Sequence, residues 1–163
     1  MARISTIELD LASESETAAL ARRLASAARP ADAILLAGEL GVGKSTFARA
    51  FIAALGGTGE VPSPTFTLVQ TYDTPRGTVW HFDLFRLDHP DEVVELGIDE
   101  ALTSGISLIE WPERLGPHRP PEALRLELAY ASSPERRRIA MTCGAAWIER
   151  LPAIVEPWFQ GLR

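Results

Sequence analysis

Apolar residues along this chain recur with two periods, one typical of strands and one typical of helices. In the first third of the chain the two periods alternate, which predicts a strand–helix–strand–helix order. In chain order these segments are residues 3–9 (strand), 18–28 (helix, after the capping box Ser13-x-x-Glu16), 33–37 (an unbroken apolar strand) and 47–55 (helix, closed by Gly56-Gly57).

The remainder of the chain is predicted to contain short strands and interrupted helices. Residues 67–72 and 78–84 flank a short turn, so we expect them to pair antiparallel, because a parallel return needs about a dozen residues or more. Gly97 divides the helical pattern of residues 91–104 into two pieces. The other predicted elements are an apolar strand at 106–111 and an antiparallel pair at 123–130 and 136–143. A C-terminal helical period runs through Trp147, Leu151, Ile154 and Trp158, and Pro152 and Pro157 are expected to break or kink this helix.

This order of elements predicts an α/β fold formed by one domain over residues 1–163. We expect a mixed, mostly parallel central sheet, with an antiparallel hairpin, antiparallel edge strands and helices on both faces. A chain of 163 residues is long enough to bury a proper core.

A phosphate-binding P-loop joins the unbroken apolar strand to the helix after it. Residues 38–46, Gly-Glu-Leu-Gly-Val-Gly-Lys-Ser-Thr, fit the pattern G-x-x-x-x-G-K-[ST], with a strand before and a helix after as that pattern requires. The alternative, a glycine-rich turn that carries Lys-Ser by chance, is disfavoured by both flanks. We therefore predict a nucleoside triphosphate site whose ligands are Glu39, Leu40, Gly41, Val42, Gly43, Lys44, Ser45 and Thr46.

Each of these groups has a distinct chemical task. Successive loop amides converge on an anion, and the helix N-terminus adds further unpaired amides. Lys44 supplies a cation for the β- and γ-phosphates, and the hydroxyl of Ser45 is a ligand for Mg²⁺.

Acidic residues at the ends of two predicted strands complete the candidate site. Mg²⁺ in such sites needs a carboxylate in addition to the hydroxyl. Glu110 ends the strand at 106–109 and Asp83 ends the strand of the predicted hairpin; either can also be an ordinary strand-end carboxylate. One acid is expected to hold the metal and the other to orient or deprotonate water, and the sequence leaves open which does which. The catalytic candidates are therefore Lys44, Asp83 and Glu110, and the metal ligands Ser45 and Glu110.

Two further residues near these acids are candidates. Thr65, in a proline-flanked loop, offers a hydroxyl to Mg²⁺ or the γ-phosphate and is predicted to belong to a switch loop; a Thr that caps the next strand is the alternative. His81 precedes Asp83 by two positions and so shares its strand face. It is a candidate to bond Asp83 or a phosphate, or to be a structural histidine.

Charge and cysteine content indicate whether the chain binds nucleic acid and where in the cell it is located. The net charge of −6 argues against tight binding of DNA or RNA by this chain alone. The basic run Arg136-Arg137-Arg138 is interpreted as a solvated strand edge or turn; contact with RNA or an acidic partner is the alternative. Cys143 is the only cysteine, no apolar run is long enough to cross a membrane, and no signal peptide is found, so a cytoplasmic location is expected.

Four motifs, taken together, resemble the TsaE family of bacterial P-loop ATPases of tRNA threonylcarbamoyladenosine (t6A) biosynthesis. They are the P-loop, Ser63-Pro64-Thr65-Phe66-Thr67-Leu68, His81-Phe82-Asp83-Leu84-Phe85-Arg86-Leu87 and Ile109-Glu110-Trp111-Pro112-Glu113-Arg114. The resemblance covers roughly residues 5–130. Many family members carry Thr-Thr after the lysine and Tyr at the position of Phe85; Ser45 keeps the hydroxyl, whereas Phe85 loses one.

The resemblance implies a weak ATPase that partner proteins activate. It implies ATP and Mg²⁺ as cofactors, and threonylcarbamoyl-transferase subunits of the TsaB and TsaD type as partners. The modified adenosine lies next to the anticodon in tRNAs that read ANN codons, and tRNA would be met mainly through that complex. Lys44, Ser45 and Thr46 would bind phosphates and Mg²⁺, Thr65 would belong to a switch-like loop, and Asp83 and Glu110 would be the functional acids.

Two other functions share the P-loop. A small-molecule kinase would need an arginine-bearing lid, but the arginine cluster at 136–138 lies in a strand pattern. A nucleotide-gated assembly factor would use bound ATP, and not its hydrolysis, to order a loop and dock a partner. A GTPase is disfavoured because the chain contains neither an Asn-Lys-x-Asp guanine signature nor Asp-x-x-Gly.

Overall fold

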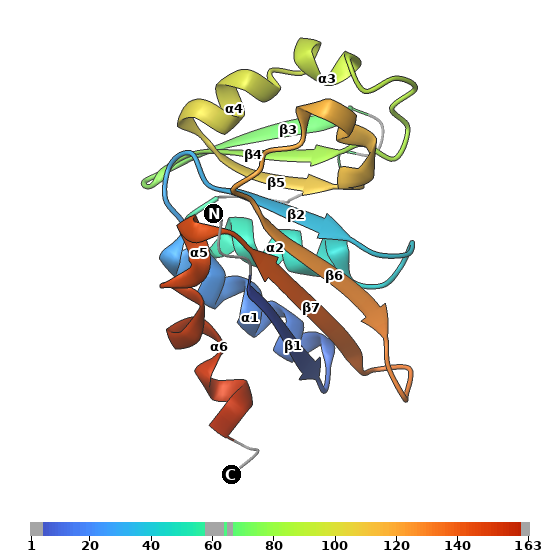
Figure 1. Cartoon of the computed structure of the whole chain (residues 1–163), viewed down its shortest axis with the longest axis vertical. Helices are drawn as coiled ribbons and strands as arrows, with labels where there is room; N and C mark the ends of the chain where they lie inside the picture. The colour runs from blue at the N-terminus through green and yellow to red at the C-terminus, as the bar shows by residue number, and fades with distance from the viewer. Residues whose placement is uncertain (1–4, 58–63, 65–66, 161–163) are drawn as a thin grey trace.

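The computed structural model of this protein describes residues 5–57, 64 and 67–160. Within these residues seven strands form one sheet, with helices on both of its faces (Figure 1). The strands are β1 (Ser5–Leu11), β2 (Ala33–Ala37), β3 (Val69–Thr74), β4 (Gly77–Asp83), β5 (Ile106–Glu110), β6 (Leu124–Tyr130) and β7 (Arg137–Cys143). The helices are α1 (Glu14–Ala27), α2 (Lys44–Ala54), α3 (Glu92–Glu95), α4 (Ile98–Ser104), the 3₁₀ helix η1 (Pro112–His118), α5 (Ala145–Ile148) and α6 (Leu151–Gln160).

The sheet is parallel at its centre and antiparallel at both edges. Its strand order is β1-β7-β6-β2-β5-β4-β3. The four central strands, β6, β2, β5 and β4, run parallel to one another. At one edge β3 pairs antiparallel with β4, and at the other β7 and β1 are antiparallel additions. The predicted mixed sheet, hairpin and antiparallel edges are therefore confirmed.

Two hydrophobic cores cover the two faces of the sheet, and β2 contributes to both. Ile34 and Leu36 belong to the core beneath α1, α2 and α6, whereas Leu35 belongs to the core beneath α3, α4 and η1. Because successive side chains of a strand point to opposite faces, a strand covered on both sides is apolar at nearly every position. The unbroken apolar run in the sequence reflects this double burial.

The hairpin of β3 and β4 has a tighter turn than the sequence predicted. Its strands extend to Thr74 and begin again at Gly77, which leaves only Pro75 and Arg76 between them. Gly77 has φ +121°, a conformation that costs a glycine little. The hydroxyl of Thr74 donates to the carbonyl of Gly77 at 2.7 Å and accepts from the amide of Arg76 at 3.2 Å, so a side chain helps to close the turn.

The predicted helix signals are confirmed in two places. The hydroxyl of Ser13 accepts a hydrogen bond from the amide of Glu16 at 3.4 Å, and the Glu16 carboxylate accepts one from the amide of Ala12. These bonds cap the first turn of α1. Gly97, with φ +91°, divides α3 from α4.

The C-terminal helix α6 contains Pro157, where the sequence predicted a break or a kink. Proline has no amide hydrogen, so a break or a kink was expected there; α6 is not broken and continues through Pro157. Proline at position 157 removes the helical partner of the Ala153 carbonyl, and the Arg23 side chain of α1 donates to that carbonyl at 2.7 Å and to the Ile154 carbonyl at 2.6 Å. A side chain from α1 thus replaces the missing helical bond.

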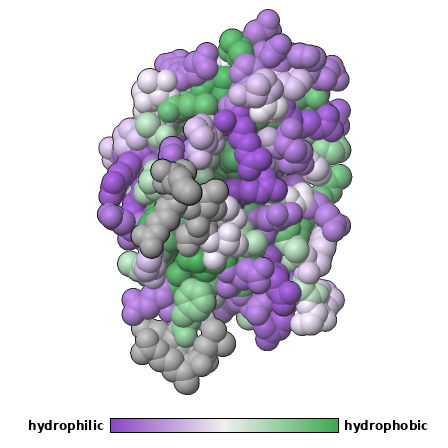
Figure 2. Space-filling view, viewed as in Figure 1, coloured by the Kyte–Doolittle hydropathy of each residue, from purple (hydrophilic) through white to green (hydrophobic). Residues whose placement is uncertain are grey.

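The surface of the described residues is mixed in character. Hydrophilic side chains cover most of the face seen in Figure 2, and hydrophobic residues appear there as separate patches. The exposed large hydrophobic residues lie on four different elements: Leu40, Val94, Tyr130 and Phe159. Among the helices that the structure describes, none combines the length and apolar character that a bilayer crossing requires.

Candidate functional site

The P-loop lies between β2 and α2, and glycines at three positions determine its shape. Gly38, Gly41 and Gly43 have φ of +141°, +79° and +120°. At Gly38 a Cβ atom would lie 2.6 Å from the carbonyl oxygen of Leu128 and 2.8 Å from Val42 Cγ1, so no larger residue fits without movement. Gly43 precedes α2 and provides no side chain to cap its first amides, which leaves them for an anion.

Lys44 is buried at the start of α2, only 4% exposed. Its ammonium donates to the carbonyl of Gly38 and lies 3.8 Å from the ring centroid of Trp111. Burial lowers the pKa of Lys44, while the charges of Glu110, Glu113 and Asp83 act in the opposite direction. The lysine is therefore a poorly solvated cation for which a polyphosphate would be a strong partner.

The two candidate acids lie side by side at the carboxyl ends of neighbouring strands. In the parallel register of β4 and β5, Asp83 is the direct partner of Glu110. Asp83 is 5% exposed and Glu110 3% exposed. Together with Lys44 and Ser45 they line a cavity of about 200 Å³ beside the P-loop. The structure therefore brings together the three catalytic candidates and both predicted metal ligands.

His81 contacts Glu110, a pairing that the sequence analysis did not foresee. Its Nε2 lies 2.7 Å from Oε2 of Glu110, and both side chains are almost fully buried. The Nδ1 atom of His81 has no hydrogen-bond partner among the described residues. The tautomer with its proton on Nε2 satisfies this arrangement, because it donates to the carboxylate and leaves only a lone pair unpaired. His81 therefore holds one oxygen of Glu110.

Asp83 and Trp111 are fixed by their own local structure. Oδ1 of Asp83 accepts a hydrogen bond from the amide of Phe85 at 3.1 Å, a turn that orients the carboxylate. The Phe85 ring lies 4.9 Å from that of Trp111, centroid to centroid. Trp111 itself has φ +58° and ψ +53°, a left-handed conformation that is uncommon for a residue other than glycine. Its ring is thereby placed against Lys44.

The oxygen ligands that line this cavity suit Mg²⁺ only when phosphates and water complete its coordination, as in P-loop proteins. No cluster of three or more His, Cys, Asp or Glu side chains suited to a metal is found within residues 5–57, 64 and 67–160. Mg²⁺ in nucleotide sites is typically held by one or two protein groups, with phosphates and water completing the octahedron. A hydroxyl from Ser45 and a carboxylate from Glu110 or Asp83 meet that requirement.

Sequence reasoning missed two residues that contact the P-loop. Arg137 was interpreted as part of a solvated strand edge or turn, but it is half-buried, donates from Nε to the carbonyl of Val42 at 2.7 Å and lies over the Tyr130 ring at 4.5 Å. Glu14 of α1 accepts a hydrogen bond from the hydroxyl of Thr46 at 3.0 Å. These contacts join segments distant in sequence, so no local pattern could have indicated them. The predicted switch residue, Thr65, lies outside the described residues.

The fold and the site together define the class of protein. A buried parallel strand, a glycine-rich loop, a helix with free amides and two adjacent strand-end acids are the parts of a P-loop nucleotide-binding domain. The family model described as threonylcarbamoyl adenosine biosynthesis protein TsaE matches residues 11–139. The chain belongs to the TsaE family.

Relatives with the name tRNA threonylcarbamoyladenosine biosynthesis protein TsaE are similar over much of the chain. The Rickettsia bellii protein is 47% identical over 104 residues, which are 63% of this chain and 72% of that protein. The Rickettsia felis protein is 47% identical over 64% of this chain and 62% of its own length, and the Bacillus subtilis protein 38% identical over 74% and 76%. The crystal structure of Bacillus subtilis YdiB is similar with a TM-score of 0.75 and 27% identity, over 99% of both chains.

Proposed function

We propose that this protein is a single-domain, Mg²⁺-dependent ATPase of the cytoplasm that serves the threonylcarbamoyl modification of the adenosine next to the anticodon in tRNAs reading ANN codons. The names of its relatives support the pathway. The observation that carries the activity is the cavity in which Lys44, Ser45, Asp83 and Glu110 converge beside the P-loop.

The loop and the start of α2 would bind the polyphosphate. Amides of residues 39–46 would form the anion nest, with the backbone of Glu39 to Gly43 on the phosphates and Thr46 at the first turn of α2. Lys44, which now donates to the carbonyl of Gly38, would transfer its hydrogen bonds to the β- and γ-phosphates. The burial that lowers its pKa would also strengthen this attraction, since charges interact more strongly away from water.

The two acids would divide the remaining work. Glu110, which His81 holds through one oxygen, would bind the metal together with Ser45, directly or through water. When bound, Mg²⁺ would neutralise charge on the β- and γ-phosphate oxygens. Asp83, oriented by the amide of Phe85, would position the attacking water and accept its proton.

The isolated chain is expected to hydrolyse ATP slowly. No arginine is among the described residues that line this cavity, and a missing arginine finger accounts for about 10³–10⁵ in rate. Subunits of the TsaB and TsaD type, with tRNA bound mainly by them, would supply the activation. Equal turnover with and without these subunits and tRNA would contradict partner activation. Association that requires ATP, with no turnover in the complex, would favour the assembly factor instead. Phosphate transferred to a metabolite would favour the kinase.

Substitution of Glu110 tests the metal assignment. We expect Glu110→Ala to lower Mg²⁺-dependent turnover about 100-fold or more, while nucleotide binding measured without metal is unchanged because the P-loop remains. Glu113→Ala is the matched control, because Glu113 is an exposed acid whose charge also acts on Lys44 but which does not line the cavity. Equal losses of turnover and metal-free binding in Glu110→Ala would assign Glu110 a structural role.

A further inference from the structure

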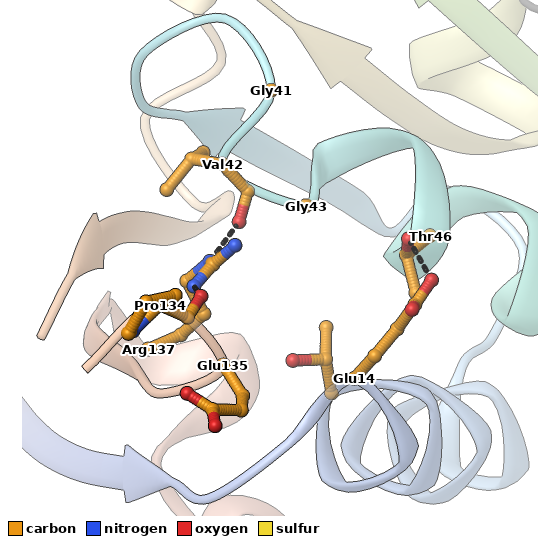
Figure 3. Close-up of a pocket in the computed structure, with 9 residues that line it drawn as sticks. Glu14, Gly41, Val42, Gly43, Thr46, Pro134, Glu135 and Arg137 are labelled. Carbon is orange, nitrogen blue, oxygen red and sulfur yellow. Dashed lines mark hydrogen bonds between the residues drawn. The ribbon is translucent and has the colours of Figure 1, made fainter.

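Arg137 connects the turn between β6 and β7 to the P-loop. Its Nε donates to the carbonyl of Val42 at 2.7 Å, and Figure 3 shows this bond reaching from the turn to the loop. Nη1 of the same side chain donates to the carbonyl of Pro134 at 2.6 Å and to that of Arg136 at 2.9 Å. Its Cζ lies 4.5 Å from the ring centroid of Tyr130. Contacts with its own turn therefore fix the position of this guanidinium.

The carbonyl that Arg137 holds belongs to the peptide that carries the amide of Gly43. This peptide is trans and planar, so its C=O and its N–H point in opposite directions. The N–H of Gly43 therefore points away from Arg137. No hydrogen bond within residues 5–57, 64 and 67–160 uses this amide. It is left for an anion at the start of α2.

The peptide between Val42 and Gly43 depends on a contact from outside the loop to keep this orientation. The next peptide is held by α2, because the amide of Phe47 donates to the carbonyl of Gly43 at 3.0 Å. Gly43 itself has φ +120°, and glycine adopts positive and negative φ about equally readily. Rotation of the peptide would turn the Val42 carbonyl, which repels phosphate, toward the ligand and the Gly43 amide away from it.

We infer that Arg137 is a positioning residue of the phosphate site, which holds the peptide between Val42 and Gly43 with its amide toward the phosphates. This inference rests on the proposed function and adds a residue of the turn between β6 and β7 that sets the affinity of the loop for polyphosphate. Arg137 acts through the backbone of Val42 and not by contact with the ligand. The role requires a hydrogen-bond donor at the position of Nε, and it does not require the positive charge.

Two substitutions separate the hydrogen bond from the charge. Glutamine places a neutral N–H donor where arginine has Nε, whereas methionine keeps a stem of similar length and has no donor. Calorimetry measures the binding of Mg·tripolyphosphate and of Mg·ATP. We expect Arg137→Met to weaken both ligands about tenfold, and Arg137→Gln to stay within about threefold of the parent protein for both.

Arg138→Ala is the matched control. Arg138 follows Arg137 on β7 and is also a cation, but it is exposed and pairs with Asp10 on β1 at 3.4 Å. Its removal lowers the net positive charge of the same strand by the same amount and leaves the contact with Val42 in place. It should change the affinity for neither ligand.

A second variant leaves Arg137 itself unchanged. Tyr130→Leu removes the ring that lies against the guanidinium, and because Tyr130 is 49% exposed the variant should fold. We expect it to weaken Mg·tripolyphosphate and Mg·ATP about threefold, the value of an exposed cation–π contact. Urea denaturation checks that each variant is folded under the conditions of the binding assay.

The outcomes differ for the inference and for the proposed function. Equal losses in Arg137→Met and Arg137→Gln would show that charge supports binding, and would overturn the inference. Binding of tripolyphosphate within about twofold of the parent protein in Arg137→Met would also overturn it, as would a loss for ATP alone, which would assign Arg137 to a contact with the nucleoside. Failure of the parent protein to bind either ligand would remove the proposed function itself.

Discussion

Replacement of His81 tests whether the site depends on the buried pair that it forms with Glu110. His81→Phe keeps an aromatic ring of similar size, so it creates no large cavity, but it removes the hydrogen-bond donor 2.7 Å from the carboxylate. Glu110 is only 3% exposed, and water cannot replace the lost donor without rearrangement. Removing one partner of a buried charged pair costs about 3–5 kcal/mol, and an unpaired buried polar group about 1–3 kcal/mol.

The buried pair of His81 and Glu110 lies between these two cases, so we expect a loss of about 3 kcal/mol in the free energy of unfolding. For a chain of 163 residues this corresponds to a decrease in Tm of about 6–12 °C. His81→Gln is the matched control, because its amide can donate from nearly the position of Nε2, and it should lose about 1 kcal/mol. Urea denaturation of both variants measures the difference.

A double-mutant cycle with Glu110→Gln isolates the interaction. Once the carboxylate is neutral, the loss of the donor should cost less, so the cycle is expected to give a coupling free energy of about 1–2 kcal/mol. As a positioning residue, His81 should also affect turnover more than nucleotide binding without metal in His81→Phe, with recovery in His81→Gln. Additive losses within about 0.5 kcal/mol, or a loss below about 1 kcal/mol for His81→Phe, would refute the claim that His81 holds Glu110.

Two further predictions concern the stability of the fold. Gly38→Ala should lower the free energy of unfolding by at least about 2 kcal/mol more than Gly77→Ala. Both glycines have positive φ, but an added Cβ would meet backbone atoms at Gly38, whereas nothing lies within 4 Å at Gly77. If chemical denaturation shows the same loss of free energy of unfolding in both variants, the strain of the positive φ alone causes the loss and the prediction is wrong. Arg150→Ala should cost about 3–5 kcal/mol and Arg150→Lys less, because Arg150 binds both oxygens of the nearly buried Asp32 at 2.7 and 3.0 Å and lysine cannot form both bonds. A thermal melt in which Arg150→Ala matches the parent protein would contradict this.

Local signals predicted most of the fold. The P-loop pattern, the capping box at Ser13 and the break at Gly97 each depend on residues within a few positions of one another, and the structure has the loop geometry, the cap and the break at these positions. The alternating and continuous apolar runs predicted the strands because the period of a side chain along a strand is a local property. The antiparallel hairpin followed from the length of its turn alone.

Contacts between residues far apart in the sequence determined the partners of two side chains that the sequence could not predict. The sequence left open whether His81 bonds Asp83 or a phosphate or is structural. In the structure it contacts Glu110, because β5 lies between β2 and β4 in the sheet. Pro157 was expected to break or kink its helix; the helix is not broken there, and Arg23 on another helix satisfies the carbonyl that proline leaves without a helical partner.

The sequence by itself determined the kind of site, and the tertiary structure determined which side chains surround it. Residues 38–46 specify a phosphate cradle, because glycine conformations and the start of a helix are properties of a short segment. Which side chains surround that cradle depends on strand order and register: Asp83 and Glu110 are neighbours only across β4 and β5, and Glu14 and Arg137 reach the loop from opposite ends of the chain. Such contacts depend on how the whole chain packs, so no segment of it encodes them alone.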